Sequence, residues 1–281
     1  MTATQELFTP KQAYAKTASL FEEIIGNSSE QICRHIFTLL PPFPPNSIIH
    51  DNGSGTGQVT AEIMSTNPPP SIMIIATDAN EYQVLGCRAK VEENGWLVEM
   101  NVMRAQALTF PDEYFTHSFT NFVVANLDEP EVCAGHIWRT LKKGGVAVVC
   151  TWAFMPHDLP MKKASAVTRG PDAKFALNWG GDWYLQSKLK DFMLSGGFEE
   201  QKIKISTSDV FLEIQDSKRW ATILWSYLGT RDDGWHQEDE DRWDEAIEIM
   251  VKELESSPAY RKNSDGTASL RFTANVSIST K

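Results

Sequence analysis

Residues 48–57 read IIHDNGSGTG, and this stretch decides the fold. Two isoleucines run into a polar pair, after which Gly53, Gly55 and Gly57 alternate with Ser54 and Thr56. Glycine adopts backbone conformations that other residues avoid, and it lets a ligand approach the main chain without a Cβ in the way. A helix that follows directly would point its free N–H groups at the same place. The stretch therefore predicts a buried strand, a loop that cradles a polar ligand, and a helix; the alternative is a tight turn without a ligand.

Short apolar runs alternate with helical stretches on both sides of this loop. Strands are predicted at 47–50, 72–77, 99–105, within 114–124 and at 146–152, with helices at 57–65, 81–94 and 131–141 and a turn at 142–145. Strands separated by helices of about 10–15 residues are typical of βαβ units and of a parallel sheet that is covered on both faces.

The two ends of the chain differ from this pattern. Helical spacing of apolar residues covers 8–40 up to a proline-rich run, and most of 209–262. A helix at 184–195, a strand at 200–206 and a last strand at 269–279 complete the prediction.

The predicted fold class is α/β. It consists of a Rossmann-like, seven-stranded, mostly parallel sheet with helices on both faces, an antiparallel last strand and helical cap segments. The whole chain, 1–281, is expected to form one domain, with its core at about 46–206 and 268–280 and its caps at 1–40 and 209–262.

The amino-acid composition argues against several classes of function. The chain has 26 Lys and Arg against 37 Asp and Glu, a net charge of −11, which argues against nucleic acid as the main partner because phosphate binding needs clustered cations. Its four cysteines form no CxxC pair and its six histidines show no metal-ligand spacing, so neither a zinc site nor a disulfide framework is predicted. Without a signal peptide or an apolar run of about 18 residues, a cytoplasmic protein with reduced cysteines and no membrane partner is expected.

The residue after the second strand suggests a nucleoside. Asp78 follows the run IIAT, 25 residues beyond Gly53, where a carboxylate can accept both hydroxyls of a ribose. It could also cap the next helix, and both roles are compatible. The glycine spacing G-S-G-T-G, with Gln58 next, departs from the dinucleotide fingerprint G-x-G-x-x-G, which disfavours a nicotinamide oxidoreductase.

Four ordered segments carry a resemblance. They are DNGSGTG (51–57), TDAN (77–80), AQALTFPDEYF (105–115) and RTLKKGG (139–145). In order and spacing they resemble the motifs of class I S-adenosylmethionine-dependent methyltransferases over residues 46–152. The segments 14–25 and 150–152 are similar to small fungal secondary-metabolite methyltransferases such as the gliotoxin thiomethyltransferase. The resemblance implies an enzyme that transfers a methyl group from S-adenosylmethionine to a small, aromatic or heterocyclic metabolite.

The resemblance also assigns cofactor-binding residues by position. They are Tyr14, Asn52, Gly53, Ser54, Gly55, Asp78, Ala79, Ala105, Gln106, Asn121 and Phe122. Residues 53–55 would face the amino-acid part of the cofactor, and Asp78 would bind the ribose. Ala79, Ala105 and Gln106 would lie around the adenine.

Three of these positions would enclose the methyl-donating end. Asn121 and Phe122 would sit under the sulfonium and methionine portion, and Tyr14 on the first helix would close over the cofactor. No metal is expected, and the only partner implied is a small-molecule substrate.

Two residues depart from the family pattern. Arg104 stands where many relatives have an acidic residue that meets the adenine amino group, and Thr116 stands where relatives often have Asp. Arginine cannot accept a hydrogen bond, so adenine recognition would rest on Gln106 and the backbone, unless Arg104 simply points to solvent. This departure keeps open a protein of the same fold without transfer activity, acting as a pericyclase, a cyclase or a regulatory partner.

The acceptor side is less defined. His157 follows the fifth strand and is the candidate catalytic base; the alternative is a solvent-exposed loop histidine. Five tryptophans are candidates for an aromatic wall or for core packing: Trp152, Trp179, Trp183, Trp220 and Trp225. The acidic run 232–245 would attract a cationic amine or form a solvated helix start. The acceptor atom is left open.

Overall fold

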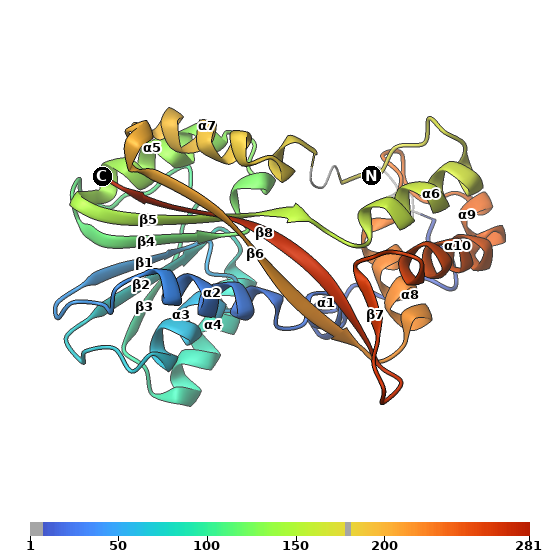
Figure 1. The fold of residues 1–281 in the computed structure, drawn as a ribbon, viewed down its shortest axis with the longest axis horizontal. Helices are drawn as coiled ribbons and strands as arrows, with labels where there is room; N and C mark the ends of the chain where they lie inside the picture. Colours follow the sequence, from blue (N-terminus) through green and yellow to red (C-terminus); the bar gives the residue numbers. More distant parts are fainter. Residues whose placement is uncertain (1–7, 178–180) are drawn as a thin grey trace, which may run out of the picture. The chain divides into compact units, whose positions relative to one another are not determined.

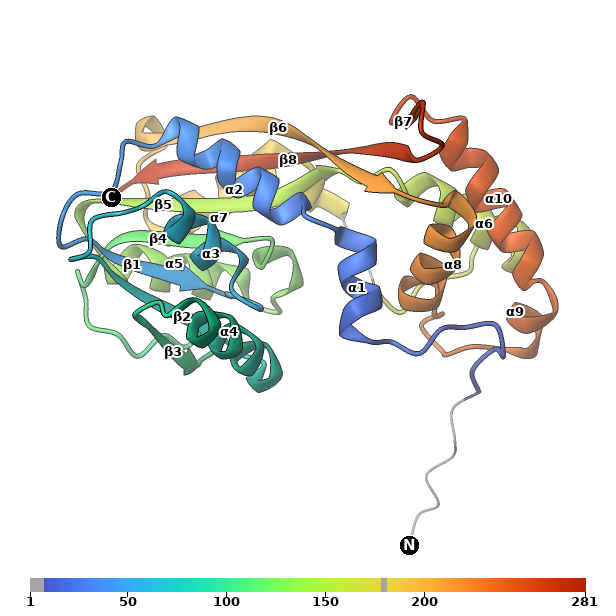
Figure 2. The same cartoon turned by 90° about the horizontal axis from the view of Figure 1, so that it is seen from below.

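The structure is a computed structural model that describes residues 8–177 and 181–281 (Figures 1 and 2). The described chain divides into two compact units. We call residues 29–153, 181–209 and 273–281 the sheet unit, and residues 8–28, 154–177 and 210–272 the helical unit. The expectation that the whole chain forms one domain stays a prediction, and Trp179 lies outside the described residues.

The sheet confirms the predicted mostly parallel α/β fold. Its strands are β1 (Ile48–Asn52), β2 (Met73–Asp78), β3 (Val98–Val102), β4 (Phe115–Asn121), β5 (Leu141–Phe154), β6 (Ile203–Ile214), β7 (Tyr260–Lys262) and β8 (Ala268–Thr280). The order is β3-β2-β1-β4-β5-β8-β6, and the first five of these strands pair in parallel. The end of β8 meets the start of β5 in antiparallel fashion, since Lys281 N–H donates to Gly145 O and Gly144 N–H donates to Lys281 O, each at 3.0 Å.

Helices cover both faces of the sheet unit. Figure 1 shows α2 (Ser28–Leu39), α3 (Gln58–Ser65) and α4 (Glu81–Asn94) on one face, and α5 (Pro130–Thr140) and α7 (Gln186–Gly196) on the other. Apolar residues of β4, β5, α5 and α7 form one buried cluster, which includes Phe115, Ile137, Leu141, Val149 and Phe192.

The helical unit holds the remaining helices. They are α1 (Ala18–Ile25), α6 (Asp158–Arg169), α8 (Ser217–Leu228), α9 (Gln237–Asp241) and α10 (Trp243–Glu255). Among its buried side chains are Trp220, Trp225 and Trp243, so Trp220 and Trp225 belong to a core and not to an open wall. No helix within 8–177 and 181–281 is long and apolar enough to cross a membrane.

Three predicted elements were wrong. Residues 142–145 form the start of β5 and not a turn, because they pair with the distant C-terminal end of β8. Residues 209–214 continue β6, where alternate side chains are buried, and 260–262 form an eighth strand, β7, paired with β8. Of residues 8–40, predicted as helical, 8–17 form no helix, whereas 18–25 and 28–39 form α1 and α2, between which Gly26 turns the chain with φ +49°.

A buried ion cluster lies within the helical unit. The Arg169 side chain is fully buried, and its Nε lies 2.7 Å from Asp239 Oδ1. Arg231 approaches the same oxygen at 3.0 Å. The Arg169 guanidinium also lies 4.3 Å from the centroid of the Trp225 ring and 5.3 Å from that of Trp235. Part of the acidic run 232–245 thus forms α9 and pairs internally through Asp239.

Candidate functional site

Three loops meet at one edge of the sheet unit. β1 lies between β2 and β4, and all three strands run in parallel, with Asn52 opposite Thr77 and Asp51 opposite Phe119. Their carboxyl ends therefore share an edge, which is where open α/β sheets bind ligands. The loops that leave this edge begin at Gly53, after Asp78 and at Phe122.

The glycine loop has a backbone conformation in which other residue types would be strained. Gly53, Gly55 and Gly57 have φ of +75°, +54° and +84°. The N–H groups of Gly53 and Ser54 both donate to Thr77 O, at 2.7 and 2.9 Å, which fixes the loop to β2. A Cβ at Gly53 would also clash with Val123 Cγ2, so this glycine lets the loop after β4 pack directly against the glycine loop.

Asp78 joins two of these loops. Its Oδ2 accepts the Gly55 N–H and its Oδ1 accepts the Asn80 N–H, both at 2.9 Å. Each carboxylate oxygen can accept a second hydrogen bond, so two acceptor positions are left, as the two hydroxyls of a ribose require. The alternative role as a helix cap belongs to Asn80, whose side chain accepts the Tyr82 N–H at the start of α4.

Two buried amides add acceptors beside the glycine loop. Asn52 Nδ2 donates to Thr120 Oγ1 at 3.2 Å, and Asn121 Nδ2 donates to Ser29 Oγ at 2.8 Å. Their Oδ1 atoms are buried, and neither finds a hydrogen-bond partner among the described residues. An unsatisfied buried acceptor costs about 1–3 kcal/mol, so both oxygens fit a ligand that donates hydrogen bonds.

The positions predicted around adenine flank this edge. Ala79 is exposed, Ala105 is buried and Gln106 is half-buried. Arg104 is exposed and pairs with Asp128 at 3.6 Å, so it points to solvent. Thr116 has no place in this site, because it stands at the start of β4, where its hydroxyl donates to Ile48 O and accepts the Ile48 N–H.

Phe122 and Trp152 form an aromatic pair that sequence reasoning did not foresee. Their rings are stacked, with centroids 4.1 Å apart and planes 15° apart. Both side chains are half-buried. Trp152 is a predicted wall residue and Phe122 a predicted cofactor-binding residue, but their stacking joins two different strands and has no signal in the sequence.

Tyr14 and His157 belong to the helical unit, so the structure does not join them to the other predicted positions. Tyr14 is exposed, and its N–H donates to Ser226 Oγ. His157 is only 4% exposed and packs near the rings of Trp220 and Phe272, each at 5.9 Å, so the expectation of an exposed loop histidine is wrong. Burial lowers the pKa of His157 to about 4, which leaves the imidazole neutral at pH 7.

Two residues behind the glycine loop are structural. His50 is buried, stacks on Phe115 with ring centroids 4.6 Å apart and forms a hydrogen bond with Thr77 Oγ1 through Nε2. Asp51 Oδ2 accepts the N–H and the hydroxyl of Thr60, at 3.0 and 2.6 Å, and so anchors α3. Burial raises the pKa of Asp51 to about 6, although the Thr60 bonds oppose the shift.

The raised pKa of Asp51 gives a pH-dependent prediction. Its carboxyl group stabilises the fold most below pH 4, in its protonated form, and this contribution is lost as the pH rises through 6. Asp51→Asn keeps an acceptor for Thr60 without the charge. We expect the stability of the variant relative to wild type to rise by about 1–2 kcal/mol between pH 4 and pH 7, as measured by urea denaturation. A difference that is flat across this range would contradict the prediction.

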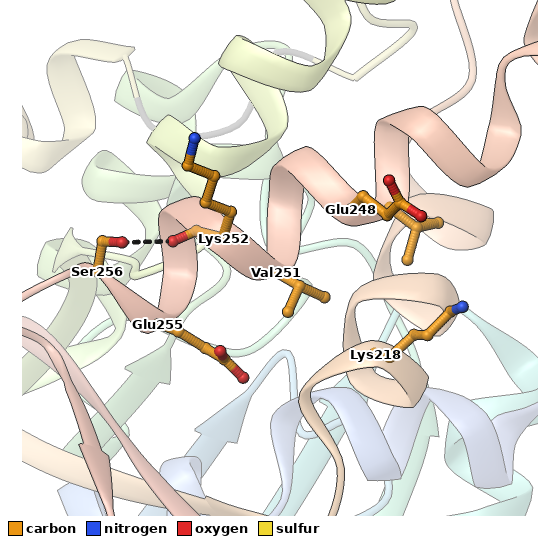
Figure 3. A pocket seen from close by; sticks show the side chains of 7 residues that line it. Lys218, Glu248, Val251, Lys252, Glu255 and Ser256 are labelled. Atoms are coloured by element: carbon orange, nitrogen blue, oxygen red, sulfur yellow. Dashed lines mark hydrogen bonds between the residues drawn. The ribbon is translucent and has the colours of Figure 1, made fainter.

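A cavity of about 400 Å³ lies elsewhere, between α8 and α10 of the helical unit (Figure 3). Its lining includes Lys218, Glu248, Val251 and Glu255, and none of the predicted site residues is among the described residues that line it. Within 8–177 and 181–281, no group of three or more His, Cys, Asp or Glu side chains is placed to hold a metal.

Comparison with known proteins gives this edge of the sheet a chemical context. Residues 50–149 match the family model of the methyltransferase domain. The methyltransferase tpcH of Aspergillus fumigatus is 24% identical over 246 residues, which are 83% of this chain and 84% of that protein. A candidate methyltransferase of Bacillus halodurans has a similar solved structure, with a TM-score of 0.60, 16% identity and coverage of 89% of this chain and 99% of that one. The [4+2]-cyclase SpnF is also similar in fold, at a TM-score of 0.51 and 16% identity, over 89% of this chain and 81% of its own.

Residues 50–149 carry a methyltransferase domain, and the fold of the chain is that of solved methyltransferases. S-adenosylmethionine is the cofactor that the sequence predicts. The residues present fit that molecule. Asp78 keeps two acceptor positions for ribose hydroxyls, and the oxygens of Asn52 and Asn121 are acceptors suited to the ammonium of its amino-acid part.

Proposed function

We propose that this enzyme methylates a small, aromatic or heterocyclic secondary metabolite. The observation that carries the proposal is the meeting of the glycine loop, the Asp78 carboxylate and the Phe122–Trp152 pair at one edge of the sheet unit. The similarity to a methyltransferase of the fungus Aspergillus fumigatus over most of both chains supports a fungal origin, and the secondary-metabolite substrate is part of the proposal. A cytoplasmic location stays part of the proposal.

The proposed roles follow the geometry of the loops. The backbone of residues 53–55 holds the amino-acid part of the cofactor, together with the amide oxygens of Asn52 and Asn121. Asp78 orients the cofactor through its ribose, and the half-buried Gln106 and its buried neighbour Ala105 contact the adenine, with Ala79 at the rim. The closing of Tyr14 over the cofactor stays a prediction from the resemblance.

The chemistry asks little of the protein beyond placement. Bound S-adenosylmethionine supplies an electrophilic methyl group on a sulfonium sulfur. The chain has to hold the acceptor atom about 3–3.5 Å from that methyl group and in line with the bond that breaks. A proton acceptor helps when the acceptor is a hydroxyl or a protonated amine, whereas a thiolate needs none.

The prediction from the sequence that His157 is the proton acceptor can be tested, because that role distinguishes acceptor types. A neutral imidazole with a pKa of about 4 can accept a proton but is a weak base, so its contribution is modest. We expect His157→Ala to slow methylation of 2-naphthol about fivefold and to leave methylation of 2-naphthalenethiol within twofold. Single-turnover rates with saturating cofactor measure both. Equal rates for variant and wild type on the hydroxyl would remove His157 from the mechanism.

The proposal is tested first by calorimetric titration of the full chain with S-adenosylhomocysteine. We expect a dissociation constant in the micromolar range or below. Transfer of a labelled methyl group from S-adenosylmethionine to planar phenols, amines and thiols then identifies the acceptor class. Undetectable binding of S-adenosylhomocysteine would contradict the cofactor site, and binding without any transfer would favour the non-transferring alternative, such as a cyclase. Arg104 had kept that alternative open, and its surface pairing with Asp128 removes this support.

A further inference from the structure

The aromatic pair of Phe122 and Trp152 is held in a defined geometry by the sheet. Two neighbouring parallel strands, β4 and β5, present the two rings, and Asn121 pairs with Cys150 just before them. The Phe122 N–H donates to Cys150 O at 3.1 Å, and this hydrogen bond fixes the backbone position of Phe122 relative to β5. The planes of the two rings are nearly parallel and closely stacked, and both side chains are half-buried.

The backbone under Phe122 is strained. Its φ is +58°, in the left-handed region that a bulky aromatic residue rarely adopts and that glycine adopts freely. The chain nevertheless has phenylalanine here. Strain of this kind gathers at functional sites, where the surrounding structure holds a side chain in a required direction.

The pair also lies next to the proposed cofactor loop. Val123, which follows Phe122, occupies the space that a Cβ at Gly53 would need. Asn121, which precedes Phe122, contributes one of the two unsatisfied amide oxygens. Phe122 therefore stands between two residues of the glycine-loop site: Asn121, with its unsatisfied amide oxygen, and Val123, which packs against Gly53.

We propose that Phe122 and Trp152 form the wall on which the methyl acceptor stacks, and that the acceptor is a planar π-system. The proposal rests on the proposed function. Stacked aromatic rings attract beyond the apolar area that they bury, and a flat acceptor gains this attraction while a puckered one of equal size does not. A rigid wall beside the donor loop also restricts the acceptor to the orientations that direct its nucleophilic atom toward the methyl group.

A matched pair of probes tests the wall. 2-Naphthol and decahydro-2-naphthol have the same carbon skeleton and one hydroxyl, but only the first is planar. Calorimetric titrations of the full chain, with and without saturating S-adenosylhomocysteine, give the affinity of each. We expect wild type to bind 2-naphthol at least fivefold more tightly than its saturated analogue. Equal affinities, or no measurable binding of 2-naphthol, would overturn the proposal.

Substitutions test whether the preference for the planar probe depends on Trp152 and Phe122. Trp152→Leu should weaken 2-naphthol binding about fivefold, and Trp152→Phe should restore most of it. Trp138→Leu is the matched control, because Trp138 is a partly exposed tryptophan on α5 of the same unit. Phe122→Gly should also weaken 2-naphthol binding, and it should lower the melting temperature less than Phe122→Ala, since both lose the ring but only glycine relieves the strained φ. If Trp152→Leu and Trp138→Leu have equal effects, the wall assignment is wrong.

The design separates this proposal from the cofactor site. If the pair instead contacts the sulfonium through its π-faces, Trp152→Leu will weaken the binding of S-adenosylmethionine much more than that of S-adenosylhomocysteine, whose sulfur is uncharged, and will leave 2-naphthol binding unaffected. That result would overturn the wall. Failure of S-adenosylhomocysteine to bind wild type would contradict the proposed function, whereas the planar preference measured without it would still report on the wall.

Discussion

Asp239→Asn is expected to lower the free energy of unfolding by about 3–5 kcal/mol, the largest effect that we predict. The substitution leaves the fully buried Arg169 guanidinium, and part of that of Arg231, without a carboxylate partner. Urea denaturation followed by tryptophan fluorescence measures the loss. Glu238→Gln is the matched control: Glu238 pairs with Arg231 but is half exposed, so its loss should cost about 1 kcal/mol or less. Equal costs for both variants would contradict the buried-cluster interpretation.

The buried cluster around Asp239 also predicts how the stability of the protein changes in acid. Burial by itself would raise the pKa of Asp239, but hydrogen bonds from Arg231 and the His236 N–H, with the charge of Arg169, lower it overall. A lowered pKa means that the stabilisation is complete above the unfolded value near pH 4 and is lost as the pH falls through the folded value. Wild type should therefore lose this stabilisation in acid, and Asp239→Asn should not show that part of the loss.

Asp78→Ala is expected to weaken S-adenosylhomocysteine binding at least tenfold. The change removes charge-assisted hydrogen bonds to the ribose, worth about 1.5–3 kcal/mol, and releases the Gly55 N–H that Asp78 holds. Calorimetry gives the dissociation constant, and Asp128→Ala is the control, because Asp128 is an exposed carboxylate of the same unit. Unchanged affinity in Asp78→Ala would refute the ribose assignment.

The parts of the fold that local sequence determines were predicted well. The helix predicted at 81–94 is α4, because Asn80 caps its start and Gly95 ends it in a left-handed conformation. The strand after which the glycines come is β1, and its neighbours follow from apolar runs of the right length. Local signals fail where a partner is distant in sequence: residues 142–145 have the composition of a turn, yet Lys281 makes them a strand.

The same limit applies to the candidate site. The glycines and Asp78 could be chosen from spacing because their roles depend on backbone conformation and on a strand end. The stacking of Phe122 on Trp152 depends on the pairing of β4 with β5, which no local pattern encodes. The burial of His157 among aromatic rings could not be predicted either, since a histidine in a polar segment after a strand is usually exposed.

The close packing of Gly53 against Val123 ties together the loops that we assign to donor and acceptor. A shift of either loop moves the packing surface of the other, so occupancy of one side changes the free energy of occupancy of the other. Thermodynamic linkage makes such an effect reciprocal: by whatever factor a bound acceptor tightens the hold on the cofactor, the cofactor tightens the hold on the acceptor. For the proposed reaction we expect the methylated product and the spent cofactor to leave cooperatively, because departure of the one would loosen the loop that retains the other.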